Sequence, residues 1–292
     1  MRILVVGGTG QIGWELRRSL SAFGNVAAPS REELDLASPD SITNAIRAIG
    51  PELVVNAAAY TAVDKAESEP ALAMKLNGDA PRILAEESAK LGAPLIHYST
   101  DYVFDGEKPS SYREDDSAAP LNEYGRSKLA GERAIPQANP VHLIFRTSWV
   151  YGPRGNNFLL TMRRLAATRR ELKIVDDQSG APTSARQIAE ATAIVIARLD
   201  KERLRAASGI YHLTAAGQTT LHGFAQAILA DRGTAAKITG ISTADYPTPA
   251  RRPKNSVLDN SKFRDAFGFV LPDWKVGLGL CLEEIGEQFE RR

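Results

Sequence analysis

The sequence RILVVGGTGQIGWEL, residues 2–16, decides the fold. A short apolar run leads into Gly7, Gly10 and Gly13, which are spaced G-x-x-G-x-x-G, and a helix-forming segment follows at once. Such glycines let the chain turn sharply, let its backbone approach a diphosphate and let the helix pack closely on the strand. The N-terminus of the helix offers N–H groups and a positive dipole end to phosphates. The stretch predicts a dinucleotide-binding strand–turn–helix; a glycine-rich turn that binds nothing is the alternative.

The first half of the chain continues this alternation of strands and helices. The segment after Ser38 begins with Pro39 at the first helical position and closes on Gly50, as a capped helix does. Short β-rich runs between such segments predict a parallel sheet that is covered on both faces. The runs are residues 2–7, 25–30, 52–58, 93–99 and 142–148.

We therefore expect an α/β fold, a doubly wound, Rossmann-like parallel sheet with a smaller C-terminal α/β substrate lobe. Residues 1–150 should form the dinucleotide-binding domain, and residues 151–292 should form mainly the substrate lobe. Segments near residues 184–215, which contain a good helix and one more short strand, should return to the first domain.

Composition narrows the class of protein. The chain has 292 residues, with 36 basic and 35 acidic side chains and a net charge of +1. Neither nucleic acid nor a membrane surface is expected as the main partner. The apolar run at the N-terminus is too short for a signal peptide or a membrane helix, and we expect a cytoplasmic protein.

The end of the second predicted strand bears on the nicotinamide cofactor. An NAD site usually places an acidic residue there to hold the ribose diol. Here Ser30 and Arg31 come first and suit a 2′-phosphate, whereas Glu32 and Glu33 follow directly. We favour NADPH and leave NADH open.

A pair of residues in NEYGRSKLAGE, residues 122–132, suggests the chemistry. Tyr124 and Lys128 are separated by four positions, so their side chains share one helix face. A tyrosine with a pKa of about 10 transfers protons poorly at neutral pH, and a nearby ammonium favours its phenolate. We expect Lys128 to lower the pKa of Tyr124, which then protonates a ketone oxygen. An exposed helix pair without function is the alternative reading.

The polar cluster in HYSTDYVFDG, residues 97–106, lies at the end of the fourth predicted strand. In a parallel sheet, ligands bind at the carboxyl ends of the strands. Asp101 and Tyr102 are therefore expected to face a substrate, unless they only cap a loop.

Several segments together resemble the dTDP-4-dehydrorhamnose reductase family of extended short-chain dehydrogenase/reductases. They are GGTGQIGWEL, NAAAYTAVDKAESEP, HYSTDYVFDG, PLNEYGRSKLAGE, FRTSWVYGPRGNNF, DDQSGAPTSA and YPTPARRPKNS. The resemblance implies reduction of the 4-keto group of dTDP-4-dehydro-6-deoxy-L-mannose, with NADPH or NADH, to dTDP-L-rhamnose. It also implies that Thr100, more than Ser99, binds the reacting oxygen, so that Thr100, Tyr124 and Lys128 are catalytic.

The resemblance extends to the binding residues. Around the cofactor it implies Gly7, Gly10, Gln11, Ile12, Gly13, Ser30, Arg31, Asp35, Leu36, Ala57, Ala58, Ala59, Tyr60 and Thr61, together with Tyr124 and Lys128. Asp35 and Leu36 would lie near the adenine. Around the dTDP-sugar it implies Thr100, Asp101, Tyr102, Tyr124, Trp149, Arg251 and Arg252. Trp149 would pack against the deoxysugar, and the two arginines would bind the diphosphate; core packing and a solvated charged loop are the respective alternatives.

The chain departs from the family at one position. Some members form a dimer around a magnesium ion that acidic residues hold. Glu15 and Glu190 are acidic here, but Arg186 stands where another acid is expected, and a cation cannot ligate a metal. We assign no metal ligand, leave Mg²⁺ open, and leave open a homodimer of another kind.

Two other functions stay open. A nucleotide-sugar 4-epimerase of the same fold would keep a tightly bound NAD and return the hydride to its substrate, and a 4,6-dehydratase would need a Glu after Asp101, where the chain has Tyr102. A regulatory subunit would bind NADP without turnover, although Thr100, Tyr124 and Lys128 are all present.

Overall fold

The glycine-rich turn joins β1 (Arg2–Val6) to α1 (Gln11–Leu20) in the computed structural model, which describes residues 1–230 and 236–290. Six strands form one parallel sheet in the order β10-β5-β4-β3-β1-β2. The other strands are β2 (Asn25–Ala27), β3 (Leu53–Asn56), β4 (Leu95–Thr100), β5 (His142–Thr147) and β10 (Gly209–His212). The expected doubly wound parallel sheet is confirmed.

The strand order reverses at β1, because β2 lies on one side of it and β3 on the other. In open α/β sheets, this switch point is where ligands bind. The strand predicted at residues 25–30 ends at Ala27. Pro29 lies just beyond, and a proline cannot donate to a strand ladder.

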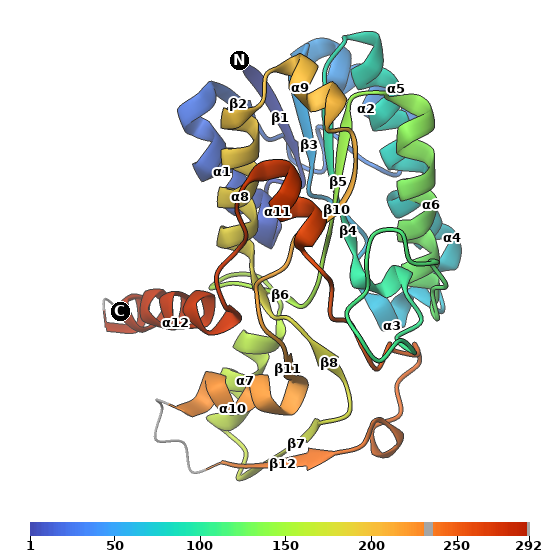
Figure 1. The fold of residues 1–292 in the computed structure, drawn as a ribbon. Helices are drawn as coiled ribbons and strands as arrows, with labels where there is room; N and C mark the ends of the chain where they lie inside the picture. The colour runs from blue at the N-terminus through green and yellow to red at the C-terminus, as the bar shows by residue number, and fades with distance from the viewer. Residues whose placement is uncertain (231–235, 291–292) are drawn as a thin grey trace.

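Helices cover both faces of the sheet (Figure 1). On one face Ile3 and Val5 pack with α1, α8 (Ala185–Arg198) and α11 (Ser261–Phe267). On the other face Leu4 and Val6 pack with α2 (Pro39–Ile49) and α5 (Ala80–Lys90), beside α6 (Glu123–Ala138). Alternate residues of β1 thus enter two separate cores, as the period of a strand requires.

The capped helix predicted after Ser38 is confirmed. The Ser38 hydroxyl accepts a hydrogen bond from the Ser41 amide at 3.3 Å, and Gly50 ends α2 in a left-handed conformation with φ of 57°. Short helices connect the remaining parts of this lobe: Ser21–Phe23, α3 (Val63–Ala66), α4 (Pro70–Met74), a π-helical turn at Lys75–Asp79, a 3₁₀ turn at Asp101–Val103 and α9 (Lys201–Ala206).

A second, smaller lobe lies beyond the carboxyl ends of the sheet strands (Figure 1). Its core contains Tyr151, Leu159, Phe224 and Trp274. The elements are β6 (Val150–Tyr151), α7 (Phe158–Ala166), β7 (Glu171–Val175), β8 (Ser179–Gly180), β9 (Thr183–Ser184), β11 (Thr219–Thr220), α10 (Leu221–Leu229), β12 (Lys237–Ile241), a 3₁₀ turn at Thr243–Asp245 and α12 (Trp274–Glu290).

The chain passes between the lobes more than once. After β9 it returns to the first lobe as α8, which packs along α1, and as β10 at the edge of the main sheet. The division at residue 150 stays a prediction.

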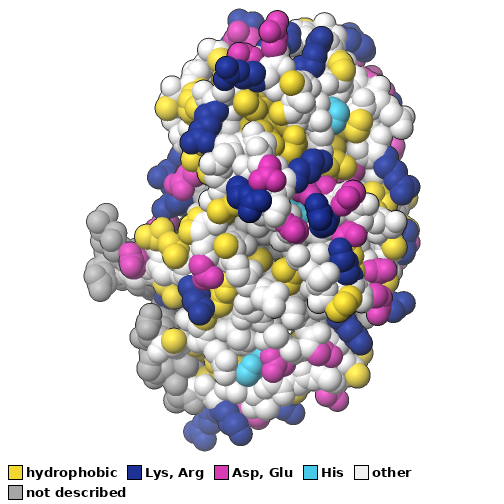
Figure 2. Space-filling view, in the orientation of Figure 1, with side chains coloured by type: hydrophobic (Ala, Val, Ile, Leu, Met, Phe, Trp, Pro, Cys, Tyr) yellow, Lys and Arg dark blue, Asp and Glu magenta, His cyan; other side chains and the backbone are white. Residues whose placement is uncertain are grey.

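The surface in Figure 2 has basic and acidic side chains dispersed over the visible face, without a continuous patch of one sign. Within residues 1–230 and 236–290, no helix is long and apolar enough to cross a membrane.

Candidate active site

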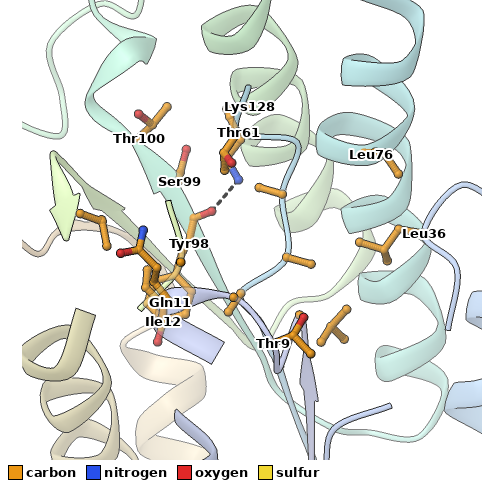
Figure 3. A pocket seen from close by; sticks show the side chains of 18 of the residues that line it. Thr9, Gln11, Ile12, Leu36, Thr61, Leu76, Tyr98, Ser99, Thr100 and Lys128 are labelled. Carbon is orange, nitrogen blue, oxygen red and sulfur yellow. Dashed lines mark hydrogen bonds between the residues drawn. The ribbon is translucent and has the colours of Figure 1, made fainter. Parts of the chain in front are cut away.

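A cavity of about 740 Å³ opens at the carboxyl ends of the sheet strands, between the two lobes (Figure 3). It brings together residues from the turn after β1, the loop after β2, the segment after β3, the end of β4 and the start of α6. The predicted residues that line it are Gly7, Gly10, Gln11, Ile12, Ser30, Arg31, Asp35, Leu36, Ala57, Ala58, Ala59, Thr61, Thr100, Asp101, Tyr102, Tyr124, Lys128 and Trp149. Gly13, Tyr60, Arg251 and Arg252 lie outside this lining.

The glycine turn is built for close approach. Gly7 has φ of +81°, and a Cβ there would lie 2.7 Å from the Ala58 backbone. A Cβ on Gly13 would lie 2.1 Å from the Gly7 carbonyl oxygen, which explains why Gly13 packs beneath the cavity and does not line it. Gly10, at the N-cap of α1, has no side chain that could accept from the first helical amides, and Gly10, Gln11 and Ile12 line the cavity. This cradle fits a diphosphate.

The loop after β2 has mixed charge. Ser30 and Arg31 line the cavity and are exposed. The Ser30 amide donates to Glu33 Oε2 at 2.7 Å, and this hydrogen bond lowers the pKa of the Glu33 carboxyl. This loop therefore carries both Arg31, which lines the cavity, and the Glu33 carboxylate, which the Ser30 amide holds.

Tyr60 belongs to the wall behind the cavity. Its amide donates to Asn77 Oδ1 at 2.8 Å, and its hydroxyl donates to Glu69 Oε2 at 2.8 Å. Its backbone is therefore attached to the π-helical turn, and its hydroxyl contacts Glu69, the residue before α4.

The three predicted catalytic side chains meet at one side of the cavity. Thr100, the last residue of β4, donates from Oγ1 to Asp101 Oδ1 at 2.9 Å and interacts with the Tyr124 hydroxyl. Lys128 is 2% exposed, and its Nζ donates to the Tyr98 carbonyl oxygen at 2.6 Å (Figure 3). Asn122 positions the helix, since its side chain accepts from the Gly125 amide at the α6 N-cap.

The expected lowering of the Tyr124 pKa is wrong for the protein alone. Burial and the nearby Asp101 carboxylate raise the pKa of Tyr124, whereas the Thr100 hydrogen bond only partly opposes them. Burial lowers the pKa of Lys128 to about 8, against the opposing effect of Glu132. Tyr124 is consequently a phenol at neutral pH, which is the form that a proton donor needs.

Asp101 and Tyr102 lie beside this group. Asp101 is 3% exposed, and burial raises the pKa of its carboxyl to about 6. The Tyr102 ring packs edge to face on the Tyr124 ring, with centroids 5.7 Å apart. Both side chains line the cavity.

Trp149 has a strained backbone. Its φ of 47° is the only positive value of a non-glycine residue in the described parts of the chain. Its ring rests on Gly180, where a Cβ would lie 2.5 Å from the indole. Such strain is common at functional sites, and here it holds the indole at the wall of the cavity.

The predicted diphosphate ligands lie beside the cavity. Arg252 forms two hydrogen bonds to Asp64, Nη1 to Oδ1 at 3.1 Å and Nη2 to Oδ2 at 2.8 Å, and interacts with Tyr102. Arg251 is exposed, and its carbonyl oxygen accepts from Asn122 Nδ2 at 2.7 Å. This loop is thereby attached to the helix that carries Tyr124.

Sequence reasoning missed part of the lining. Thr147 ends β5 as Thr100 ends β4, and Ser148 follows it, so the same strand-end rule could have identified both. Gly155 and Asn156 could not be found in this way. Their loop lies against the glycine turn, because Asn157 Nδ2 donates to Gln11 Oε1 at 2.8 Å.

The acidic cluster around Glu15 does not fit a divalent metal. Glu15 is 4% exposed and binds Arg18 at 2.8 Å and Arg186 at 3.2 Å, and Arg186 also pairs with Glu284 at 2.8 Å. The Arg186 guanidinium thus takes the central position among the carboxylates. Within the described residues, no group of three or more His, Cys, Asp or Glu could hold a metal ion.

The chain matches the family described as the RmlD substrate binding domain over residues 1–287. It is 50% identical to a dTDP-4-dehydrorhamnose reductase of Burkholderia thailandensis, over 99% of this chain and 100% of the relative. A dTDP-4-dehydrorhamnose reductase of Clostridium acetobutylicum has a similar structure, with a TM-score of 0.92 and 36% identity over 98% of this chain and 100% of that one. The enzyme of Bacillus anthracis, in complex with NADP, has a TM-score of 0.89 and 33% identity, over 97% of this chain and 99% of that one.

Proposed function

The chain belongs to the dTDP-4-dehydrorhamnose reductase family, and on that premise we propose that it is an NADPH-dependent reductase of dTDP-4-dehydro-6-deoxy-L-mannose. The product is dTDP-L-rhamnose. One observation carries the proposal: a single cavity joins a diphosphate cradle at the first turn to Thr100, Tyr124 and Lys128. The Bacillus anthracis relative in complex with NADP supports the choice of NADPH.

Bound NADPH would supply the hydride to the 4-keto carbon. Tyr124 is a phenol at neutral pH and gives its proton to the ketone oxygen, which becomes the hydroxyl of the product. Thr100 lies against Tyr124 and hydrogen-bonds the same oxygen. Lys128, held by the Tyr98 carbonyl oxygen, lies in the same lining and would bind the nicotinamide ribose.

The remaining lining positions the sugar nucleotide. Trp149 packs against the deoxysugar face, and Asp101 and Tyr102 contact the sugar hydroxyls. Arg251 and Arg252 approach the diphosphate from the rim, and Arg252 would then share its guanidinium between Asp64 and the phosphates.

The test is reduction of the ketone in solution. The protein is mixed with NADPH and dTDP-4-dehydro-6-deoxy-L-mannose, and absorbance of the reduced nicotinamide is followed. We expect one NADPH to be oxidised for each dTDP-6-deoxyhexose formed. Unchanged NADPH with epimerised substrate would indicate a 4-epimerase, and cofactor binding without turnover would indicate a regulatory subunit.

Tyr124→Phe isolates the proton donor. The variant should lose at least about 100-fold in kcat, because general acid catalysis by a positioned group is typically worth that much. NADPH binding, measured by fluorescence titration, should stay unchanged, since the phenol oxygen alone is removed. A variant that retains wild-type kcat would exclude Tyr124 as the donor.

A further inference from the structure

A buried chain of hydrogen bonds runs behind the cavity from the segment after β3 to Lys128. The Ala58 amide donates to Asn56 Oδ1 at 3.1 Å, and Asn56 Nδ2 lies 3.0 Å from His97 Nδ1. His97 Nε2 lies 3.2 Å from Lys128 Nζ. Asn56 and His97 face each other in the register of β3 and β4, and they are 1% and 0% exposed.

The direction of this chain follows from its first contact. Only an oxygen can accept from the Ala58 amide, so the Asn56 side-chain orientation is determined and its NH₂ group points at His97. His97 Nδ1 must then accept. A neutral imidazole has a single N–H, which is therefore on Nε2, and burial together with the Lys128 charge lowers the pKa of His97 well below its usual value.

The Nε2–H of His97 consequently points at Lys128 Nζ. An ammonium has three donors and no lone pair, whereas a neutral amine can accept. We propose that His97, held in one tautomer by Asn56, is a positioning residue that presents an N–H to Lys128 and favours its neutral amine. The role in turnover rests on the proposed function, because it concerns the charge of a group in that site.

The other groups near Lys128 also influence the balance between its ammonium and its neutral amine. Glu132, one turn along α6, favours the ammonium, but it is engaged by Arg146 of β5 through hydrogen bonds of 2.7 and 2.9 Å. Tyr124 and Asp101 share the cavity lining with Lys128, and the Tyr98 carbonyl accepts from either form of the lysine. Burial acts in the same direction as the His97 N–H and lowers the pKa of Lys128.

The tautomer can be measured without substrate or cofactor. Long-range ¹H–¹⁵N spectra of uniformly ¹⁵N-labelled protein separate protonated from unprotonated imidazole nitrogens. We expect His97 to be protonated on Nε2. His142 serves as an internal reference for the other tautomer. Its Nδ1 lies 2.7 Å from the Asn139 carbonyl oxygen, so Nδ1 must carry the proton. A proton on His97 Nδ1 would overturn the proposal.

Asn56→Asp should reverse the chain. A carboxylate accepts hydrogen bonds both from the Ala58 amide and from an N–H at His97 Nδ1. The single imidazole proton of His97 would therefore be on Nδ1, and Nε2 would present a lone pair to Lys128. The ¹³Cε shift of Lys128, followed against pH, should titrate near pH 8 in the natural protein and about one unit or more higher in Asn56→Asp.

The added charge needs a separate control. The double variant Asn56→Asp/His97→Leu keeps the carboxylate and removes the imidazole, with His97→Leu as the matching single variant. The rise caused by Asn56→Asp should be larger with the imidazole present than in the His97→Leu background, as a double-mutant cycle measures. Equal rises in both backgrounds would show that the tautomer has no effect on Lys128.

Turnover gives an independent readout. The alkaline limit of kcat/KM should move upward in Asn56→Asp together with the Lys128 titration. Absence of NADPH oxidation by the natural protein would contradict the proposed function. The two NMR measurements would still decide whether His97 carries its proton on Nε2 and whether this tautomer affects the titration of Lys128.

Discussion

At the scale of single residues, we propose that charge in the loop after β2 distinguishes NADPH from NADH. NADPH differs from NADH by a 2′-phosphate, for which an arginine fork is suited. Arg31 is the cation of the loop after β2, and the same loop holds the Glu33 carboxylate through the Ser30 amide. These two side chains should therefore act in opposite directions on NADPH.

Arg31→Ala should raise the KM for NADPH by about tenfold, equivalent to about 1.4 kcal/mol, with little change for NADH. Glu33→Gln should lower the KM for NADPH, since it removes a negative charge from the same surface. Initial rates with each cofactor give both values. An equal effect of Arg31→Ala on NADH and NADPH would mean that Arg31 does not contact the 2′-phosphate.

At the scale of elements, the join between β1 and α1 depends on the absence of one Cβ. The Gly13 Cα lies so close to the turn after β1 that a methyl group on it would lie 2.1 Å from the Gly7 carbonyl oxygen. The helix and the cofactor cradle are thus placed by the same contact.

Gly13→Ala should destabilise the protein by about 1–3 kcal/mol, because α1 must move away from the turn after β1, and NADPH should bind more weakly. Gly279→Ala is the matched control. It is a helical glycine in α12 whose Cβ would meet nothing within 4 Å in the described part of the chain, and it should be neutral or stabilising by up to about 1 kcal/mol. Urea unfolding measures both variants. Equal free energies of unfolding would contradict the packing role of Gly13.

The contact between α1, α8 and α12 involves an arginine in an acidic cluster. Because Arg186 lies between Glu15 and Glu284, the melting temperature should not change with EDTA or with added Mg²⁺. Arg186→Ala should destabilise the protein by about 1–3 kcal/mol, since it leaves the buried Glu15 with less compensation.

Arg264→Ala is the control for this ion pair. Arg264 and Asp265 are both exposed, and such a pair contributes no more than about 1 kcal/mol. Thermal unfolding measures the two variants with and without Mg²⁺. A rise in the melting temperature of the natural protein with Mg²⁺ would show that a metal binds despite Arg186.

At the scale of the whole molecule, His212 connects three distant segments. It lies in β10, its amide donates to Glu114, and its ring nitrogen Nδ1 lies 3.2 Å from the Asp259 carbonyl oxygen. It is 0% exposed, and burial near Arg146 lowers its pKa to about 3. Between pH 3 and the unfolded-state value of about 6.5, the unfolded chain binds a proton at this residue that the folded protein does not.

This histidine should therefore make the protein less stable as the pH falls below about 6.5. At pH 5.5, one pH unit below the pKa of the unfolded chain, protonation of this histidine in the unfolded chain should lower the free energy of unfolding by about 1.4 kcal/mol. His212→Gln keeps a polar side chain that does not titrate, so the variant should lose about that much less stability between pH 7.5 and 5.5. Equal losses in urea unfolding would show that His212 becomes protonated in the folded protein.

Much of the fold and part of the site could be predicted from local sequence patterns. The strand–turn–helix at residues 2–16, the existence and order of the five first strands along the chain, and the helix between Ser38 and Gly50 agree with the structure, because burial period and capping are properties of neighbouring residues. The second strand is shorter than predicted and ends at Ala27. The glycine motif and the polar end of the fourth strand predicted part of the cavity lining, because parallel strands bring their carboxyl ends to one edge, and the family resemblance added the other predicted residues.

Packing between distant segments accounts for the remainder. The Asn56–His97 pair joins residues 41 positions apart, the Arg186–Glu15 pair joins residues 171 apart, and Arg252 meets Asp64 across 188. The raised pKa of Tyr124 likewise depends on burial and on Asp101 from another element. Local periodicity specifies which face of a strand or helix is buried. The charge, tautomer and desolvation of a side chain depend instead on which other side chains the fold brings into contact with it. The tertiary structure alone therefore sets the chemical state of the groups that the sequence motifs identify.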